Sequence, residues 1–381
     1  MKIAILGYGT VGSGVYELLQ ETNKTKNQKI EVVRVWNRPN PSKDIPLYCE
    51  EVETIVQDPS IQCVVETLNG IHPAYELIKA CLINEKHVVT ANKAVVAAYF
   101  EEFQQLAIEN EVQCRYEASV GGGIPWITSL EQVKQSEEIR CIRGIFNGTS
   151  NYILSNMTES GLDFSEALQN AQRLGYAEAE PSADVDGMDS INKLVISAQV
   201  GFNRSIQMRD IVEHSMRHVT ARDIRYFKTL GYVLKYMGEI MRDEGTFEGS
   251  VMLQAVPHTH LLANVSQNNN MGLLTGSISG EMAFYGQGAG KYPTAQAMIR
   301  DMEKILEQSE EHKVTDSPLI WNDHREHRFV LISEQAIVSE WFIHQEGPYY
   351  NSVPMTFDTL EAVTKELSPS VRVIKYLGEG E

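Results

Sequence analysis

The chain has 381 residues, of which 43% are hydrophobic and 22% are charged, and its 33 basic and 51 acidic residues give a formal net charge of −18. Length and composition indicate a globular protein with two or three domains. A surface this acidic repels phosphate backbones and anionic lipids, so we expect no nucleic acid and no membrane as partner.

The sequence favours a cytoplasmic location. No apolar run comes near the roughly 20 residues that a bilayer-spanning helix needs. The first apolar run reaches Gly7 at once, which is not expected of a signal peptide. The five cysteines are scattered and never spaced as Cys-x-x-Cys, which favours reduced thiols over disulfides or a zinc site.

The first part of the chain alternates short apolar runs with helical patterns. The apolar runs cover residues 2–6, 30–36, 63–65, 87–90 and 112–118, and helices are predicted from the pattern around Val15 to Leu19 and near residues 74–82 and 98–110. Such alternation predicts parallel βαβ units. We therefore expect an α/β fold whose residues 1–125 form a Rossmann-type, doubly wound nucleotide-binding domain.

A glycine motif follows the first predicted strand and opens a helix. Gly7 permits a tight turn, Gly9 lets the backbone approach a pyrophosphate, and Gly12 lets helix and strand pack closely. The helix N-terminus supplies free N–H groups for the phosphates. The motif predicts a dinucleotide site at Gly7, Tyr8, Gly9, Thr10, Val11 and Gly12; the alternative is a glycine-rich turn without a ligand.

The end of the second strand bears on the choice of dinucleotide. An acid at this position normally binds the ribose 2′-hydroxyl of NAD. Here the strand ends in Asn37 and Arg38, with Lys43 nearby, so no carboxylate repels a 2′-phosphate and Arg38 can pair with one. We expect NADP(H) to be preferred and NAD(H) to be possible, unless Arg38 is a solvated turn residue.

A second, α+β domain is predicted over residues 126–287, after a flexible, tightly turned junction at residues 121–125. Its expected elements are a strand at 139–146, helices near 151–160, 165–174, 189–200 and 221–242, and apolar runs at 249–256 and 272–284. Phe227, Tyr232 and Tyr236 are spaced like one helix face and are expected in the core. A helix near 294–307 precedes the tail.

The tail, residues 311–381, reads as a short C-terminal αβ module. It has apolar runs at 328–332, 337–343 and 371–376 and a helical pattern at 359–367.

Residues 174–193 (LGYAEAEPSADVDGMDSINK) collect carboxylates in a turn-rich loop that leads into a helix. Asp189 and Lys193 are four residues apart and therefore share one helix face. Taken alone, the pair fits an acid in the first helical turn plus a surface ion pair.

The loop also resembles the substrate segment of homoserine dehydrogenases. Four more segments resemble that family in the same order, so the likeness covers roughly residues 1–305: residues 89–94 (VTANKA), 116–125 (YEASVGGGIP), 144–153 (GIFNGTSNYI) and 285–294 (YGQGAGKYPT). The resemblance implies the NAD(P)H-dependent, reversible reduction of L-aspartate 4-semialdehyde to L-homoserine in threonine, methionine and isoleucine biosynthesis.

The resemblance also implies roles for individual residues. Lys193 matches the general acid/base lysine, and Lys93 matches a second active-site lysine between cofactor and substrate. Substrate-binding positions are matched by Glu178, Asp189, Asp184 and Gly175, and Gly288 matches a position at the cofactor. Carboxylates suit a substrate that carries an ammonium group.

Further implications concern a cation and assembly. Glu117, Val120, Gly122 and Ile124 match a family site for a monovalent cation, sodium or potassium, with one carboxylate and three backbone carbonyls as ligands; alternatively, Glu117 forms a salt bridge. The family pattern returns residues 288–310 to the nucleotide domain and implies a homodimer through the central sheet. The Pro-Gly-Val-Leu turn of the family's regulatory domain is absent, which argues against feedback control by threonine.

Other assignments stay open at this stage. A dehydrogenase of a related amino or hydroxy acid, and a non-catalytic nucleotide-binding sensor, are the alternative functions. His214 with His218, placed four apart in a helix, and His258 with His260 are each half of a possible metal site, but packing or solvated histidines fit better.

Overall fold

The computed structural model describes residues 1–26, 30–38, 44–307, 319–337, 339–365, 367–368 and 370–378. The chain divides into two compact units. Unit 1 comprises Met1–Glu138, Val195–Ile206 and Gly286–Pro318, and unit 2 comprises Ile139–Leu194, Gln207–Tyr285 and Leu319–Glu381. The boundary between Leu194 and Val195 falls inside helix α9 (Met188–Phe202).

Unit 1 contains a sheet of five parallel strands in the order β2-β1-β3-β4-β5. They are β1 (Lys2–Leu6), β2 (Glu31–Trp36), β3 (Cys63–Glu66), β4 (His87–Thr90) and β5 (Cys114–Arg115). The strand order reverses beside β1, which pairs with both β2 and β3. This confirms the doubly wound sheet, whose ligands bind at the carboxyl ends of the strands.

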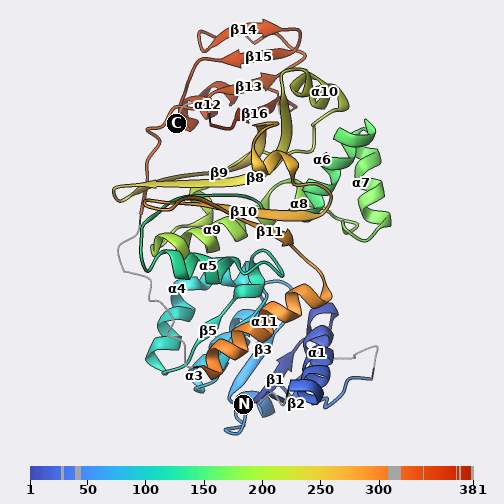
Figure 1. Ribbon diagram of the computed structural model, residues 1–381, viewed down its shortest axis with the longest axis vertical. Helices are drawn as coiled ribbons and strands as arrows, with labels where there is room; N and C mark the ends of the chain where they lie inside the picture. The colour runs from blue at the N-terminus through green and yellow to red at the C-terminus, as the bar shows by residue number, and fades with distance from the viewer. Residues whose placement is uncertain are drawn as a thin grey trace. The chain divides into compact units, whose positions relative to one another are not determined.

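The helices of unit 1 are α1 (Thr10–Lys26), α2 (Glu53–Val56), α3 (Ala74–Ile83), α4 (Lys93–Glu109), the 3-10 turn η1 (Glu117–Ser119), α5 (Trp126–Val133) and α11 (Lys291–Leu306). Helices α1 and α11 lie side by side (Figure 1). Val15, Leu19, Met298 and Met302 join Ile5 in one buried cluster, so α11 completes the core of the nucleotide-binding sheet.

The predicted fifth strand, residues 112–118, is wrong beyond Arg115. The backbone N–H of Glu117 donates to the Asp301 carboxylate (2.8 Å), and the chain turns into η1 instead of continuing the ladder. The junction that follows leads directly into α5, which the sequence analysis did not predict. Val120 and Ile124 are buried, so this junction is a packed turn.

Unit 2 contains an eleven-stranded mixed sheet with the path β11-β10-β6-β8-β9-β16-β13-β15-β14, and β7 and β12 also pair with β9. The strands are β6 (Ile139–Ile145), β7 (Val212–Glu213), β8 (Tyr232–Asp243), β9 (Thr246–Pro257), β10 (Asn269–Gly276), β11 (Gly280–Gln287), β12 (Ile320–Trp321), β13 (Phe329–Ile332), β14 (Phe342–Glu346), β15 (Tyr349–Ser352) and β16 (Arg372–Tyr376). With its helices, this sheet forms the α+β part of the fold that the sequence predicts in addition to the nucleotide-binding domain.

The helical segments of unit 2 are α6 (Gly148–Ser160), α7 (Phe164–Arg173), α8 (Ser182–Val185), the first turns of α9, η2 (Met208–Asp210), α10 (Ala221–Thr229), η3 (Leu261–Asn264) and α12 (Phe357–Thr364). Capping starts several of them: Asn147 accepts the Ser150 N–H at α6, and Thr220 accepts the Asp223 N–H at α10. The bounds of α6, α7 and α9 confirm the predicted helices near 151–160, 165–174 and 189–200 within a few residues.

The predicted helix over residues 221–242 is wrong in its second half. Helix α10 ends at Thr229, and Gly231 adopts a positive φ of 87° that helical residues do not tolerate. From Tyr232 to Asp243 the chain instead pairs with β9 along its whole length. Phe227 and Tyr236 are buried as expected, but they lie on a helix and a strand respectively.

The tail strands extend the sheet of unit 2. β16 pairs with β9 on one side and β13 on the other, and Lys375 on β16 donates to Glu239 on β8 (2.7 Å). Arg143 on β6 binds the same carboxylate (3.1 Å). Although burial alone would raise it, Lys375 and Arg143 hold the pKa of Glu239 below its ordinary value.

The apolar runs at 328–332 and 371–376 correspond to β13 and β16, and the 359–367 pattern to α12, which starts earlier, at Phe357. The run at 337–343 forms a strand only from Phe342, and its Val338 lies outside the described residues. No helix within the described ranges is long and apolar enough to cross a membrane.

Candidate active site

The glycine motif forms the turn between β1 and α1. Gly7 has a positive φ of 99°, and a Cβ there would lie 2.8 Å from Thr67 Oγ1 at the end of β3. A Cβ on Gly12 would overlap the carbonyl oxygen of Gly7. At Gly9 nothing lies within 4 Å of such an atom, so the backbone there is open to a ligand. The geometry fits a tight turn at Gly7 and close packing at Gly12, and it leaves space beside Gly9.

Residues around the glycines complete the loop. The Tyr8 N–H donates to Asn37 Oδ1 (3.1 Å), which ties the loop to the end of β2. Helix α1 begins at Thr10 and Val11, and the first N–H groups of a helix have no intrahelical acceptor. These groups and the positive end of the helix dipole make the loop suitable for an anion such as a pyrophosphate.

Arg38 follows β2 at the same edge of the sheet. Its side chain is exposed and Nη2 donates to the carbonyl of Asn69, after β3 (2.8 Å). This contact holds the Arg38 guanidinium at the end of β2, where a dinucleotide in this fold is expected to place its adenosine ribose. Lys43, noted beside it in the sequence, lies outside the described residues.

Lys93 is the first residue of α4, at the carboxyl end of β4. Its position is set by Asn92, which accepts the Val95 N–H (3.3 Å) and donates to the Gly70 carbonyl (2.7 Å). The half-buried lysine therefore lies at the ligand-binding edge of the unit 1 sheet.

Glu66, which sequence reasoning missed, organises this edge. It ends β3, is fully buried, and accepts hydrogen bonds from the Leu68 N–H (2.6 Å) and Thr90 Oγ1 (2.5 Å). Thr90 Oγ1 in turn accepts the Asn92 N–H (2.9 Å). Burial raises the pKa of Glu66 to about 7. The signal in the sequence was an acid that closes an otherwise apolar strand.

Lys193 and Asp189 form a buried pair on the first turns of α9. Lys193 Nζ lies 2.8 Å from Asp189 Oδ2 and donates to the Phe146 carbonyl at 2.6 Å. The side chains are 10% and 6% exposed, so the pair is not the surface i,i+4 bridge that the spacing alone also allowed. Sharing one helix face, as predicted, positions the ammonium group beside the carboxylate.

Asp184 joins the same cluster through Asn147. Asn147 Nδ2 donates to Asp184 Oδ1 (2.6 Å) and to Asp189 Oδ2 (2.8 Å). The structure thus brings together Asp184, Asp189 and Lys193, which come from α8 and α9, at the junction of β6 and α6.

Glu178 and Gly175 lie in the loop between α7 and α8. Gly175 follows α7 with a positive φ of 76°, and Glu178 is exposed, with its carbonyl accepting from Gln172 Nε2 (3.1 Å). Both predicted positions are therefore exposed, in the loop that leads to the half-buried Asp184 and the buried Asp189.

Glu117 lies in a second buried acidic cluster, in unit 1. Its carboxylate accepts the N–H groups of Ile127 (3.0 Å) and Thr128 (2.9 Å) at the start of α5, as well as the Thr128 hydroxyl. Lys304 Nζ lies 3.8 Å away. Burial raises the pKa of Glu117, and burial together with Glu117 raises the pKa of Asp301 to about 8.

The turn from Val120 to Ile124 packs against the segment at Gly288. Gly122 has a positive φ of 56°, and a Cβ on it would lie 2.6 Å from the Gly288 carbonyl group. Arg300 Nη2 donates to the Gly123 carbonyl (3.0 Å), and Ile124 O accepts the Trp126 N–H (2.8 Å). The close approach explains why Gly122 has no side chain.

The two histidine pairs, His214 with His218 and His258 with His260, lie in loops and turns. His214 and His218 follow β7 in a loop, so their predicted helix is wrong. His258 Nδ1 lies 3.0 Å from the Gly231 carbonyl, and His260 Nδ1 accepts the Leu262 N–H (3.2 Å). Throughout the described part of the chain, no three His, Cys, Asp or Glu residues are grouped to hold a metal ion, and the five cysteines are free thiols.

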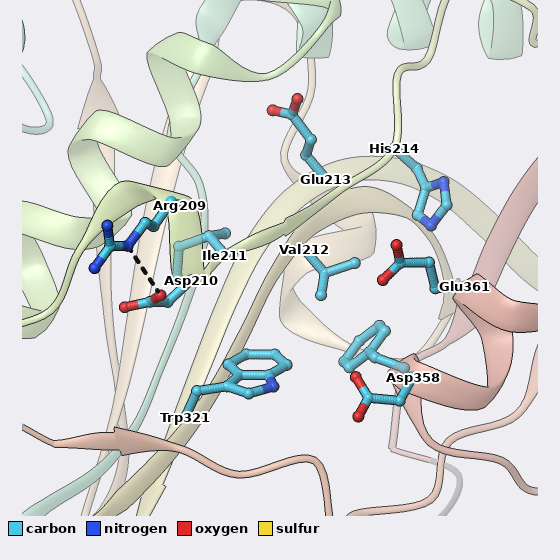
Figure 2. Close-up of a pocket in the computed structure, with 10 residues that line it drawn as sticks. Arg209, Asp210, Ile211, Val212, Glu213, His214, Trp321, Asp358 and Glu361 are labelled. Atoms are coloured by element: carbon cyan, nitrogen blue, oxygen red, sulfur yellow. Dashed lines mark ion pairs between the residues drawn. The ribbon is translucent and has the colours of Figure 1, made fainter. Parts of the chain in front are cut away.

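A cavity of about 460 Å³ in unit 2 has no predicted catalytic or binding residue among its described lining residues. Figure 2 shows Arg209 paired with Asp210 (3.8 Å), and Asp358 and Glu361 contributed by α12. The remaining lining residues are Ile211, Val212, Glu213, His214, Trp321 and Phe357. We therefore assign the candidate active site to the residues described above and not to this cavity.

Comparison with known proteins adds independent findings. A family model described as homoserine dehydrogenase matches residues 125–302, and one described as homoserine dehydrogenase, NAD binding domain, matches residues 7–117. A homoserine dehydrogenase of Synechocystis sp. is 43% identical over 319 residues, 80% of this chain and 73% of the relative. One of Lactococcus lactis is 32% identical over 394 residues, 100% and 90% of the two chains.

Solved structures agree with these matches. The crystal structure of a homoserine dehydrogenase from Thiobacillus denitrificans is similar with a TM-score of 0.86 and 30% identity, over 99% of this chain and 98% of that one. The similarity therefore extends through the tail strands of unit 2.

Proposed function

The chain belongs to the homoserine dehydrogenase family, and on that premise we propose how its residues carry out the reversible NAD(P)H-dependent reduction of L-aspartate 4-semialdehyde to L-homoserine. Bound NAD(P)H supplies the hydride for the aldehyde carbon. Lys193 gives a proton to the aldehyde oxygen, and takes one back in the reverse direction. The observation that carries this role is the buried ammonium already held by Phe146 O and Asp189.

Carboxylates of unit 2 receive the substrate ammonium group. Asp189 lies beside Lys193, Asp184 is linked to Asp189 through Asn147, and the exposed Glu178 is on the approach to them. An ammonium that leaves water needs such partners, because a desolvated cation without a counter-charge is costly. Gly175, without a side chain, leaves room for the substrate next to this loop.

The loop from Gly7 to Gly12 binds the pyrophosphate, with Tyr8, Thr10 and Val11 contributing backbone N–H groups, and Lys93 and Gly288 lie on the cofactor side. Arg38 pairs with a 2′-phosphate, so NADP(H) is preferred while NAD(H) is possible. The support is the exposed guanidinium at the end of β2 and the lack of an acid at Trp36 and Asn37.

A monovalent cation, sodium or potassium, binds at Glu117 with the carbonyls of Val120, Gly122 and Ile124. The carboxylate uses three hydrogen bonds to the start of α5 and keeps capacity for a fourth contact. Burial makes the charged forms of Glu117 and Asp301 costly and raises their pKa values, and a hard cation would offset that cost. Oxygen ligands of this kind suit such an ion.

The protein acts as a cytoplasmic homodimer in threonine, methionine and isoleucine biosynthesis, without nucleic acid or membrane partners. β11 ends the strand path of the unit 2 sheet, and alternate residues along it, including Tyr285, are exposed. Such an edge is a natural place for pairing with a second copy. Light scattering of the purified protein tests this: a monomer mass at micromolar concentration would contradict it.

The decisive experiment measures initial rates of NADPH and NADH oxidation with L-aspartate 4-semialdehyde, each with sodium, potassium or choline as the cation. We expect turnover with both cofactors, faster with NADPH, and stimulated by sodium or potassium. No oxidation by a folded protein that binds NADPH would contradict the proposed roles.

A further inference from the structure

Asn147 lies where β6 ends and α6 begins, and its side chain is almost entirely buried. Its Oδ1 accepts the Ser150 N–H (2.7 Å), which sets the orientation of the amide group. Nδ2 therefore faces the opposite way, toward the acids of α8 and α9.

Both hydrogens of Nδ2 are used on carboxylates. One bond goes to Asp184 Oδ1 (2.6 Å) and the other to Asp189 Oδ2 (2.8 Å). An amide nitrogen has two donor hydrogens, so the group is fully committed to this pair. No other neutral side chain of this size offers two donors and a capping acceptor at once.

The neighbouring backbone ties the lysine to the same junction. Phe146 O accepts Lys193 Nζ (2.6 Å) and Asn270 Nδ2 (2.8 Å), and Asp189 Oδ2 accepts both Lys193 and Asn147. A displacement of Asn147 would therefore move Asp189 Oδ2, which accepts the hydrogen bond from Lys193 Nζ.

Charge explains why a neutral donor stands here. Two carboxylates brought to one group repel each other, and hydrogen bonds to their charged forms offset part of that cost. A lysine or arginine at this position would neutralise the acids before substrate arrived. An amide holds them in place without adding a charge. The two carboxylates and the single ammonium of Lys193 then leave a net negative charge for an incoming ammonium.

We propose that Asn147 is a positioning residue that holds Asp184 and Asp189 as a preorganised site for the substrate ammonium group. The inference rests on the proposed roles of these two acids. It predicts that loss of the two donors weakens binding of substrates with an ammonium group, while binding of the cofactor is unchanged.

The test is Asn147→Ser, because serine keeps a good helix cap but cannot reach both acids. We expect the KM for L-homoserine to rise at least tenfold and the inhibition constant of L-2-aminobutanoate, which keeps the substrate's ammonium group, to rise in parallel. The dissociation constant of NADP⁺ should stay within twofold. Asn156→Ser is the matched control, because Asn156 is also on α6 and, among the residues that the structure describes, donates to Tyr152 O and not to an acid.

The outcomes separate the inference from its premise. If Asp189→Asn raises KM and Asn147→Ser leaves KM and the inhibition constant within twofold, the role of Asn147 is wrong. If Asp189→Asn itself leaves KM unchanged, the proposed role of the acids fails first. Should Asn147→Ser not fold, Asn147→Asp keeps the capping oxygen and places a third carboxylate by the acids; a KM like that of the native protein would then overturn the inference.

Discussion

The two units each contain a cluster of acids. In unit 2, Asp184 and Asp189 both accept hydrogen bonds from the Asn147 amide, and Asp189 also pairs with Lys193. In unit 1, the backbone N–H of Glu117 donates to Asp301, and Lys304 lies 3.8 Å from Glu117. The first cluster contains its own cation at 2.8 Å. In the second, burial raises the pKa of both acids.

The two clusters are suited to different tasks. A carboxylate that is already paired with a lysine can hold a proton donor in a fixed place. Buried acids whose lysine is farther away, at 3.8 Å from Glu117, favour the uptake of a proton or a metal ion. Substitutions in the two units should therefore differ in kind: loss of activity in unit 2, and altered dependence on pH or salt in unit 1.

Lys193→Ala should have the largest effect. Removing the proton donor should lower kcat roughly 10³-fold or more, in line with the loss of general acid catalysis. NADPH binding, followed by nucleotide fluorescence, should persist because the residues of the glycine loop are untouched. A kcat within tenfold of the native protein would show that the lysine pair in unit 2 is structural.

Glu66→Gln extends the comparison to another buried acid of unit 1. Burial raises the folded-state pKa of Glu66 to about 7, so the folded protein binds this proton more tightly than the unfolded chain. Stability should therefore fall as pH rises from about 5 to 7, and stay reduced above. Between pH 5 and pH 8 this cost should be roughly 2–3 kcal/mol and be absent in Glu66→Gln.

The measurement is urea unfolding of both proteins at pH 5 and pH 8. Glu101→Gln, at an exposed position on α4, is the control for loss of one charge. Equal pH dependence of the native protein and Glu66→Gln would contradict the assignment.

Replacing choline chloride by sodium or potassium chloride at equal ionic strength should raise the Tm of the native protein, since a cation that binds only the folded state stabilises it by about 2.7 kcal/mol at 100 times its Kd. Glu117→Gln should remove most of this dependence. Asp189→Asn, in the cluster that has its own lysine, should keep it. If sodium or potassium raised the Tm of the native protein and of Glu117→Gln equally, the proposed cation site at Glu117 would be contradicted.

Arg38→Ser should have the smallest effect, because this cation is exposed. The ratio of kcat/KM with NADPH to that with NADH should fall roughly tenfold, the size of one charge-assisted hydrogen bond. Arg34→Ser, also exposed and on β2, is the control. An unchanged ratio would mean that Arg38 only binds Asn69.

Much of the fold and part of the candidate site could be predicted from the spacing of residues that are close in sequence. The glycine loop could be predicted because turn, strand and helix are adjacent in sequence, and Asp189 with Lys193 because four residues make one helical turn. Asn147 and Asp301 could not, since their partners are distant: Asp301 and Glu117 are 184 residues apart. The strand β8 was mistaken for a helix because Phe227, Tyr232 and Tyr236 also fit helical spacing, and only pairing with β9 decides between the two.

The place of β16 has a consequence for how the protein is made. This strand, among the last in the chain, inserts between β9 and β13 and delivers Lys375 to the buried Glu239. On a ribosome, β8 and β9 emerge long before it, with Glu239 lacking one of its cations and β9 lacking a neighbour. The sheet of unit 2 can therefore close only after β16 has been synthesised, and chains that stall before β16 expose a long unpaired edge to chaperones and proteases.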